Sequence, residues 1–155
     1  MRFSLILVLV ATFTLLPACA KKSTSSGPVS IQEQNGVRQV TVKGSEGTTQ
    51  IGEGVVDPNT LGLPVYPGAV PSKGGSFSSH TKQGGAQIVT IETNDPFEKV
   101  YAFYKANMPP GSEKMKVGQS MATFQVSSGK DSSRKGVSVA TYQGKTEITL
   151  IVTGP

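Results

Sequence analysis

The sequence predicts an α+β fold, in which a small antiparallel β-sheet carries one amphipathic helix on one face and follows a β-hairpin. Glycine (18) and proline (10) are frequent among the 155 residues, which favours turns and short strands. Most apolar residues alternate with polar ones, and only the segment 97–108 has the apolar spacing of a helix. The resulting order β-α-β-β-β-β favours helix-on-sheet packing. A mostly β, barrel-like sheet with the helix at one end is the alternative.

An export signal is predicted over residues 1–18. Arg2 provides a positive start, and the run 3–16 is apolar and uncharged. This run is shorter than the roughly 20 residues of a membrane-spanning helix. It is followed by Pro17, Ala18 and the only cysteine of the chain, Cys19.

Leu16-Pro17-Ala18-Cys19 resembles the lipobox of bacterial lipoproteins, which has an aliphatic residue, a tolerated residue and a small residue before the cysteine. The resemblance implies diacylglyceryl transfer to Cys19, cleavage before it and acylation of the new N-terminus. Two or three acyl chains anchor a protein stably, so membrane lipid is the expected partner of Cys19 and the cell envelope the expected location. Ala20 follows the cysteine, which favours the periplasmic face of the outer membrane in a Gram-negative host. An ordinary signal peptide with an accidental cysteine is the alternative.

Residues 19–35 are predicted to be the lipidated cysteine and a flexible tether, because the segment 21–30 is small, polar and contains glycine and proline. Residues 36–56 are predicted to form a β-hairpin. Its strands lie at 37–42 and 48–51, on either side of a glycine-rich turn.

Residues 57–155 are predicted to form the α+β domain. Asp95 is expected to cap the helix, with Pro96 at its first position and Glu98 completing a capping box. One face of the helix carries an apolar stripe made of Phe97, Val100, Tyr101, Tyr104 and Met108. The predicted strands are a short one around Phe77, then 87–93, 114–117, 121–126, 136–142 and 146–153, the last two forming a hairpin.

Three pieces of this domain, LPVYPGA at 63–69, TNDPFEKVYAFYKANMP at 93–109 and the terminal hairpin, resemble a group of uncharacterised bacterial envelope lipoproteins. The shared features are the Pro-Gly turn, the Thr-x-Asp start of the helix and its Phe-Tyr end. The resemblance covers about residues 60–153, and it implies an envelope lipoprotein without an assigned activity or site.

No catalytic residue, cofactor or metal site is predicted. One histidine and one cysteine cannot form a Cys/His zinc site. His80 is the only histidine available as a general base, and Ser79 and Lys82 have the spacing of a Ser-Lys dyad in a glycine- and serine-rich segment. Gly144-Lys145-Thr146 resembles the end of a phosphate-binding loop, but Val139 stands where its first glycine is required.

A binding role is predicted from charge. The formal net charge is +5, and Lys130, Arg134 and Lys135 form the only basic cluster. The loops 72–85 and 127–134 are the expected contact regions. An anionic envelope polymer or an envelope protein is the expected partner, whereas nucleic acid is not expected outside the cytoplasm. The predicted function is that of a membrane-anchored envelope lipoprotein with a non-catalytic binding or structural role. The alternative is a small envelope hydrolase that uses carboxylate or Ser-Lys chemistry.

Overall fold

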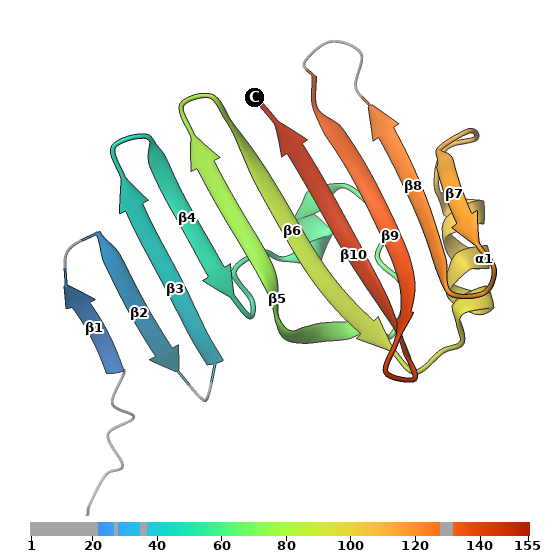
Figure 1. Cartoon of the computed structure of the whole chain (residues 1–155), viewed down its shortest axis with the longest axis horizontal. Coiled ribbons are helices and arrows are strands. Elements are labelled where there is room, and N and C mark those ends of the chain that lie inside the picture. The colour runs from blue at the N-terminus through green and yellow to red at the C-terminus, as the bar shows by residue number, and fades with distance from the viewer. Residues whose placement is uncertain (1–21, 27, 35–36, 128–131) are drawn as a thin grey trace, which may run out of the picture.

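The structure is a computed structural model that describes residues 22–26, 28–34, 37–127 and 132–155. The described residues form ten strands, one α-helix and one short 3₁₀ helix (Figure 1). The strands are β1 (Lys22–Ser26), β2 (Val29–Gln34), β3 (Val37–Gly44), β4 (Gly47–Gly52), β5 (Val70–Thr81), β6 (Gly84–Thr93), β7 (Glu113–Val117), β8 (Met121–Ser127), β9 (Arg134–Tyr142) and β10 (Lys145–Gly154). The helices are η1 (Pro58–Leu61) and α1 (Phe97–Asn107).

All ten strands belong to one antiparallel sheet with the order β1-β2-β3-β4-β5-β6-β10-β9-β8-β7. The chain builds β1 to β6 as a meander, passes through α1 to the opposite edge, and returns until β10 lies between β6 and β9 (Figure 1). A mostly antiparallel sheet with a single helix is compatible with the predicted α+β class. The sheet is, however, much larger than the small sheet predicted, because the N-terminal strands continue it.

Two strands lie in the segment predicted to be a flexible tether, which corrects that prediction. In β2, Val29 and Ile31 alternate with polar residues and lie opposite Val42 and Val40 of β3. Strand β1 pairs with β2 along its whole length. Pairing gives the backbone amides and carbonyls of this polar segment their hydrogen-bond partners, which composition alone does not reveal.

The predicted hairpin is present as β3 and β4, but it is not separate from the domain that follows. Strand β4 pairs with β5, and Ile51 lies opposite Phe77. The predicted loop 72–85 is also corrected, since β5 runs to Thr81 and β6 begins at Gly84. A bulge between Pro71 and Ser76 lets the glycine-containing part of β5 remain in the sheet.

The hydrophobic core lies on one face of the sheet, which we call the covered face, under α1, η1 and the loop that follows η1. Phe124 of β8 packs against the rings of Tyr101 and Tyr104 at centroid distances of 6.0 and 6.2 Å. The predicted helical stripe is confirmed at Phe97, Val100, Tyr104 and Met108, which are at most 5% exposed. Its fifth member, Tyr101, is only partly buried and packs against the core. The core residues of the strands are Val89, Ile91, Ala122, Phe124, Val137, Val139, Ile148 and Leu150.

The start of α1 differs from the predicted capping box. Pro96 precedes the first helical residue, and no side chain caps the helix. The carboxylate of Asp95 instead accepts hydrogen bonds from the Tyr66 hydroxyl at 2.7 Å and from the Lys99 ammonium at 3.1 Å. The tyrosine comes from a distant part of the chain, so local spacing did not indicate that it would occupy this carboxylate.

Ionic contacts join α1 to the edge strand β7. Lys105 pairs with Glu113, whose carboxylate also accepts a hydrogen bond from the Tyr101 hydroxyl at 3.2 Å. The hydrogen bond from Lys105 lowers the pKa of Glu113. Lys116 lies 4.0 Å from the Tyr101 ring centroid and 3.2 Å from Glu98. These contacts tie the helix to the short strand at its edge of the sheet.

Replacing Tyr104 with phenylalanine is expected to raise the free energy of unfolding by about 1 kcal/mol, because a buried hydroxyl without a partner carries its desolvation cost uncompensated. The Tyr104 hydroxyl has no hydrogen bond of standard geometry among the described residues, and only the backbone of Tyr66 offers it a weak polar contact. Burial also raises the pKa of this phenol. Urea titration measures the effect. Tyr66→Phe is the matched control and should lose about 1 kcal/mol, since the Tyr66 hydroxyl has a partner in Asp95. A loss of stability in Tyr104→Phe would contradict the assignment.

Candidate functional site

The face of the sheet opposite α1, which we call the open face, contains a hollow of about 430 Å³ around Gly136. Gly136 lies in β9 between the buried Val137 and the partly buried Lys135, and its Cβ position points away from the core. Its neighbours in register are Ile151 on β10 and Gln125 on β8. Ile151, Gly136 and Gln125 form a row across β10, β9 and β8. Because glycine has no side chain, this row of side chains has a gap between Ile151 and Gln125.

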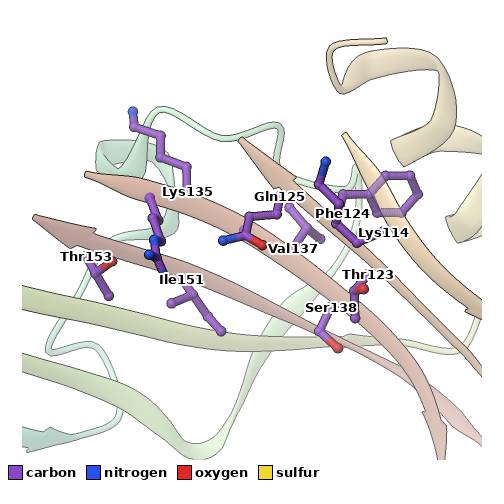
Figure 2. A pocket seen from close by; sticks show the side chains of 11 residues that line it. Lys114, Thr123, Phe124, Gln125, Lys135, Val137, Ser138, Ile151 and Thr153 are labelled. Carbon is purple, nitrogen blue, oxygen red and sulfur yellow. The ribbon is translucent and has the colours of Figure 1, made fainter. Parts of the chain in front are cut away.

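The hollow is lined by side chains from four strands, shown in Figure 2. The side chains of Thr123, Ser138, Ile151 and Thr153 lie on the open side of the ribbon, as strand alternation requires. Lys135 extends to the other side. The complete lining is Lys114, Thr123, Phe124, Gln125, Arg134, Lys135, Gly136, Val137, Ser138, Ile151 and Thr153.

The lining is basic and rich in hydrogen-bond donors. Its described residues include three basic ones and no aspartate or glutamate, together with the hydroxyl groups of Thr123, Ser138 and Thr153. One of the three, Lys135, directs its ammonium to the covered face. The Gln125 amide adds two further donors. Such a surface complements an anionic group, because guanidinium and hydroxyl donors bind carboxylate or phosphate oxygens.

The structure divides the predicted basic cluster. Lys130 lies outside the described residues. Arg134 is exposed on the open face, and its guanidinium forms no ion pair with the described part of the chain. The Lys135 ammonium donates to the Leu61 carbonyl at 3.0 Å and holds η1 against the covered face. Adjacent residues of a strand point to opposite faces, so Arg134 and Lys135 cannot form one patch.

Sequence reasoning missed Lys114 and Gly136 as residues of this site. A glycine within a strand often marks a place where no side chain packs or where a ligand or another backbone comes close. Gly136 could therefore have been identified from the sequence. Lys114 carried no such signal, because only the pairing of β7 with β8 brings it to the hollow. Its ammonium donates to the Gly111 carbonyl at 3.0 Å.

The residues considered for catalysis have other partners. Ser79 lies on the open face with its hydroxyl 3.2 Å from that of Thr49. Lys82 lies 4.0 Å from Glu46. His80 is exposed, and its Nδ1 lies 3.4 Å from the hydroxyl of Ser78. No group of three or more metal-ligating side chains occurs in the described ranges. The hydrolase alternative stays a prediction, and Cys19 lies outside the described residues.

The second polar cluster of note joins Tyr66, Asp95 and Lys99. Burial, together with the hydrogen bond to Asp95, raises the pKa of Tyr66 to about 12. The Tyr66 hydroxyl and the Lys99 ammonium lower the pKa of Asp95. The Asp95 carbonyl also accepts a hydrogen bond from Thr146 at 2.7 Å. The phenol therefore stays protonated at neutral pH, and the cluster fastens the Pro-Gly turn and the helix start to β10.

The fold and the hollow define the protein as an antiparallel β-sheet protein with one covered face and one open face that carries a basic depression. No protein-family model matches the chain, and neither a curated protein nor a solved structure matches it significantly. Over the described ranges, no helix has the length and apolar character needed to cross a bilayer.

Proposed function

We propose that the protein is a membrane-anchored envelope lipoprotein with a non-catalytic binding role. The motif at residues 16–19 supports acylation of Cys19, and the resemblance of residues 60–153 to envelope lipoproteins supports the same location. The periplasmic face of the outer membrane is the proposed location in a Gram-negative host. The anchor would hold the folded sheet at the membrane surface.

The observation that carries the binding role is a hollow whose described lining residues include basic and hydroxyl groups but no carboxylate. Arg134 supplies a planar guanidinium that can donate two parallel hydrogen bonds to one carboxylate or phosphate. Thr123, Ser138 and Thr153 contribute hydroxyl groups to the same hollow, and Ile151 provides an apolar wall. We propose that an anionic group of an envelope polymer or of an envelope protein binds here.

Replacing Arg134 with glutamate is expected to weaken binding of an anionic polymer roughly tenfold, because a charge-assisted hydrogen bond is lost and a repulsive charge is introduced. Fluorescently labelled lipopolysaccharide and polyglutamate are the probes, and anisotropy measures their affinity. Lys43→Glu is the matched control, since Lys43 is an exposed lysine of β3 outside the hollow and the charge change is the same. The control should change the affinity less than twofold.

Gly136→Val tests the shape of the hollow without changing its charge. A Cβ at this position would meet its nearest neighbour, the Phe124 carbonyl oxygen, at 3.4 Å, so the backbone accepts a Cβ here with little adjustment. We expect it to fill the space between Ile151 and Gln125 and to reduce the affinity. Equal losses for Arg134→Glu and Lys43→Glu, with none for Gly136→Val, would show that the probe responds only to net charge.

A further inference from the structure

The N-terminal part of the sheet, made of β2, β3 and β4 and called the wing here, has an apolar surface on the open face. Four of its aliphatic residues are exposed, namely Val29 (38%), Ile31 (39%), Val42 (38%) and Ile51 (46%). They are neighbours in register, since Ile31 lies opposite Val40, Val40 opposite Ile51, and Val29 opposite Val42. The wing therefore presents one continuous aliphatic patch.

The other face of the wing is polar. Its residues include Ser30, Gln32, Gln39, Thr41 and Gln50, which alternate with the aliphatic residues along the same strands. The helix α1 lies at the opposite end of the sheet, near β7 and β8 (Figure 1). The buried core residues of the described chain all come from beyond β4. The wing is thus an amphipathic sheet whose apolar side is not the side that faces the core.

The proposed lipid anchor is close in sequence to the first strand of the sheet. Cys19 precedes Lys22, the first residue of β1, by three residues. An extended chain spans at most about 3.6 Å per residue, so the Cα atoms of Cys19 and Lys22 are at most about 11 Å apart. Strand β1 pairs directly with β2, and neighbouring strands are about 4.8 Å apart. An acylated Cys19 would therefore hold the wing within a short distance of the bilayer.

We propose that the apolar face of the wing lies on the lipid bilayer beside the acylated Cys19, so that the protein contacts the membrane through its sheet as well as through its anchor. This inference rests on the proposed function for the position of the membrane. Amphipathic surfaces bind at the headgroup boundary by burying their apolar side, and the patch has the required side chains. The charged pair on this face, Glu33 and Arg38, lies 3.6 Å apart and is neutral as a pair.

The bilayer contact is separate from the basic hollow. The wing ends at β4, whereas the hollow begins at β10, and β5 and β6 lie between them in the sheet. Substitutions in the wing and in the hollow should therefore affect different measurements.

The test uses the absence of tryptophan from the chain, which makes a single introduced tryptophan an unambiguous reporter. Ile51→Trp places it on the apolar face, and Gln50→Trp, the adjacent exposed residue of β4, places it on the polar face. Each full-length acylated variant is reconstituted into vesicles of phosphatidylethanolamine and phosphatidylglycerol that contain lipids brominated on their acyl chains. We expect quenching about threefold stronger for Ile51→Trp than for Gln50→Trp, because an interfacial surface buries its apolar side roughly 5–10 Å deep. Ile31→Trp and Gln32→Trp repeat the comparison on β2 in case one variant fails to fold.

Equal quenching of both faces in acylated protein would overturn the inference while leaving the proposed anchor intact. A blue-shifted Ile51→Trp spectrum in vesicles without any quenching by the brominated lipids would also overturn it, since a second copy of the chain would then cover the patch. Intact-mass analysis of the same samples reports acylation of Cys19 independently. Face-specific quenching in protein without acyl chains would support the contact of the wing with lipid while refuting the anchor.

Discussion

Replacing Leu150 with alanine is expected to lower the free energy of unfolding by about 3–5 kcal/mol, because it leaves a cavity in a tightly packed part of the core. Leu150 is fully buried and lies at the centre of the sheet. It sits on β10 between Val89 of β6 and Val137 of β9, which lie opposite it in register. Strands on both sides restrict the collapse of the backbone around the lost side chain. Urea titration followed by circular dichroism measures the loss.

The matched control for this prediction is Ile151→Ala, at the next residue of the same strand. Ile151 points to the open face and is only partly buried, so its truncation should cost about 1 kcal/mol. Both variants remove aliphatic carbons from β10 and change its β-propensity in the same direction. Similar losses for the two substitutions would contradict the assignment of the covered and open faces.

Replacing Cys19 with serine is expected to abolish acylation completely, because a thiol is required to form the thioether to diacylglycerol. The proposed processing also cuts the chain just before this residue, so the variant should retain residues 1–18. Incorporation of a labelled fatty acid and intact mass of the purified protein measure both effects. Either effect is all-or-none, which makes this the largest change expected for any single substitution in the chain.

The control for this experiment is Ala20→Ser, which introduces the same hydroxyl one residue after the cysteine and should leave acylation unchanged. A native protein that carries no fatty acid would refute the lipoprotein proposal. Labelling that persists in Cys19→Ser would do the same, since the acyl chain would then be attached elsewhere. The hollow around Gly136 would remain a candidate site in both cases.

Several local features of the fold were predictable from the sequence. Alternation of apolar residues located the strands that became β6, β8, β9 and β10, and the spacing of Phe97, Val100, Tyr104 and Met108 located α1 and its buried stripe. The turn at Gln143 and Gly144 was also predictable, and both residues have the positive φ angles of a tight hairpin, 49° and 78°. These features depend on residues close together in the chain.

Other features depended on pairing between distant strands. Composition predicted that the residues before β3 are flexible, yet they form β2, which pairs with β3, and β1, which pairs with β2. The carboxylate of Asp95 was expected on the helix amides, but Tyr66 reaches it from 29 residues away. The candidate site shows the same limit, because it combines Arg134 with Lys114 from a different strand and leaves Lys135 on the other face.

The sequence by itself therefore determined the strands β3, β4 and β6 to β10, the position of the single helix and most of its buried residues. These properties follow from the repeats of 2 and 3.6 residues that each backbone conformation imposes on its own side chains. Only the tertiary structure decided that all ten strands join one sheet, that the wing is apolar on the side away from the core, and that the hollow opens at Gly136. Strand order and register place residues side by side that are far apart in the chain, and a local pattern does not encode which strands will meet.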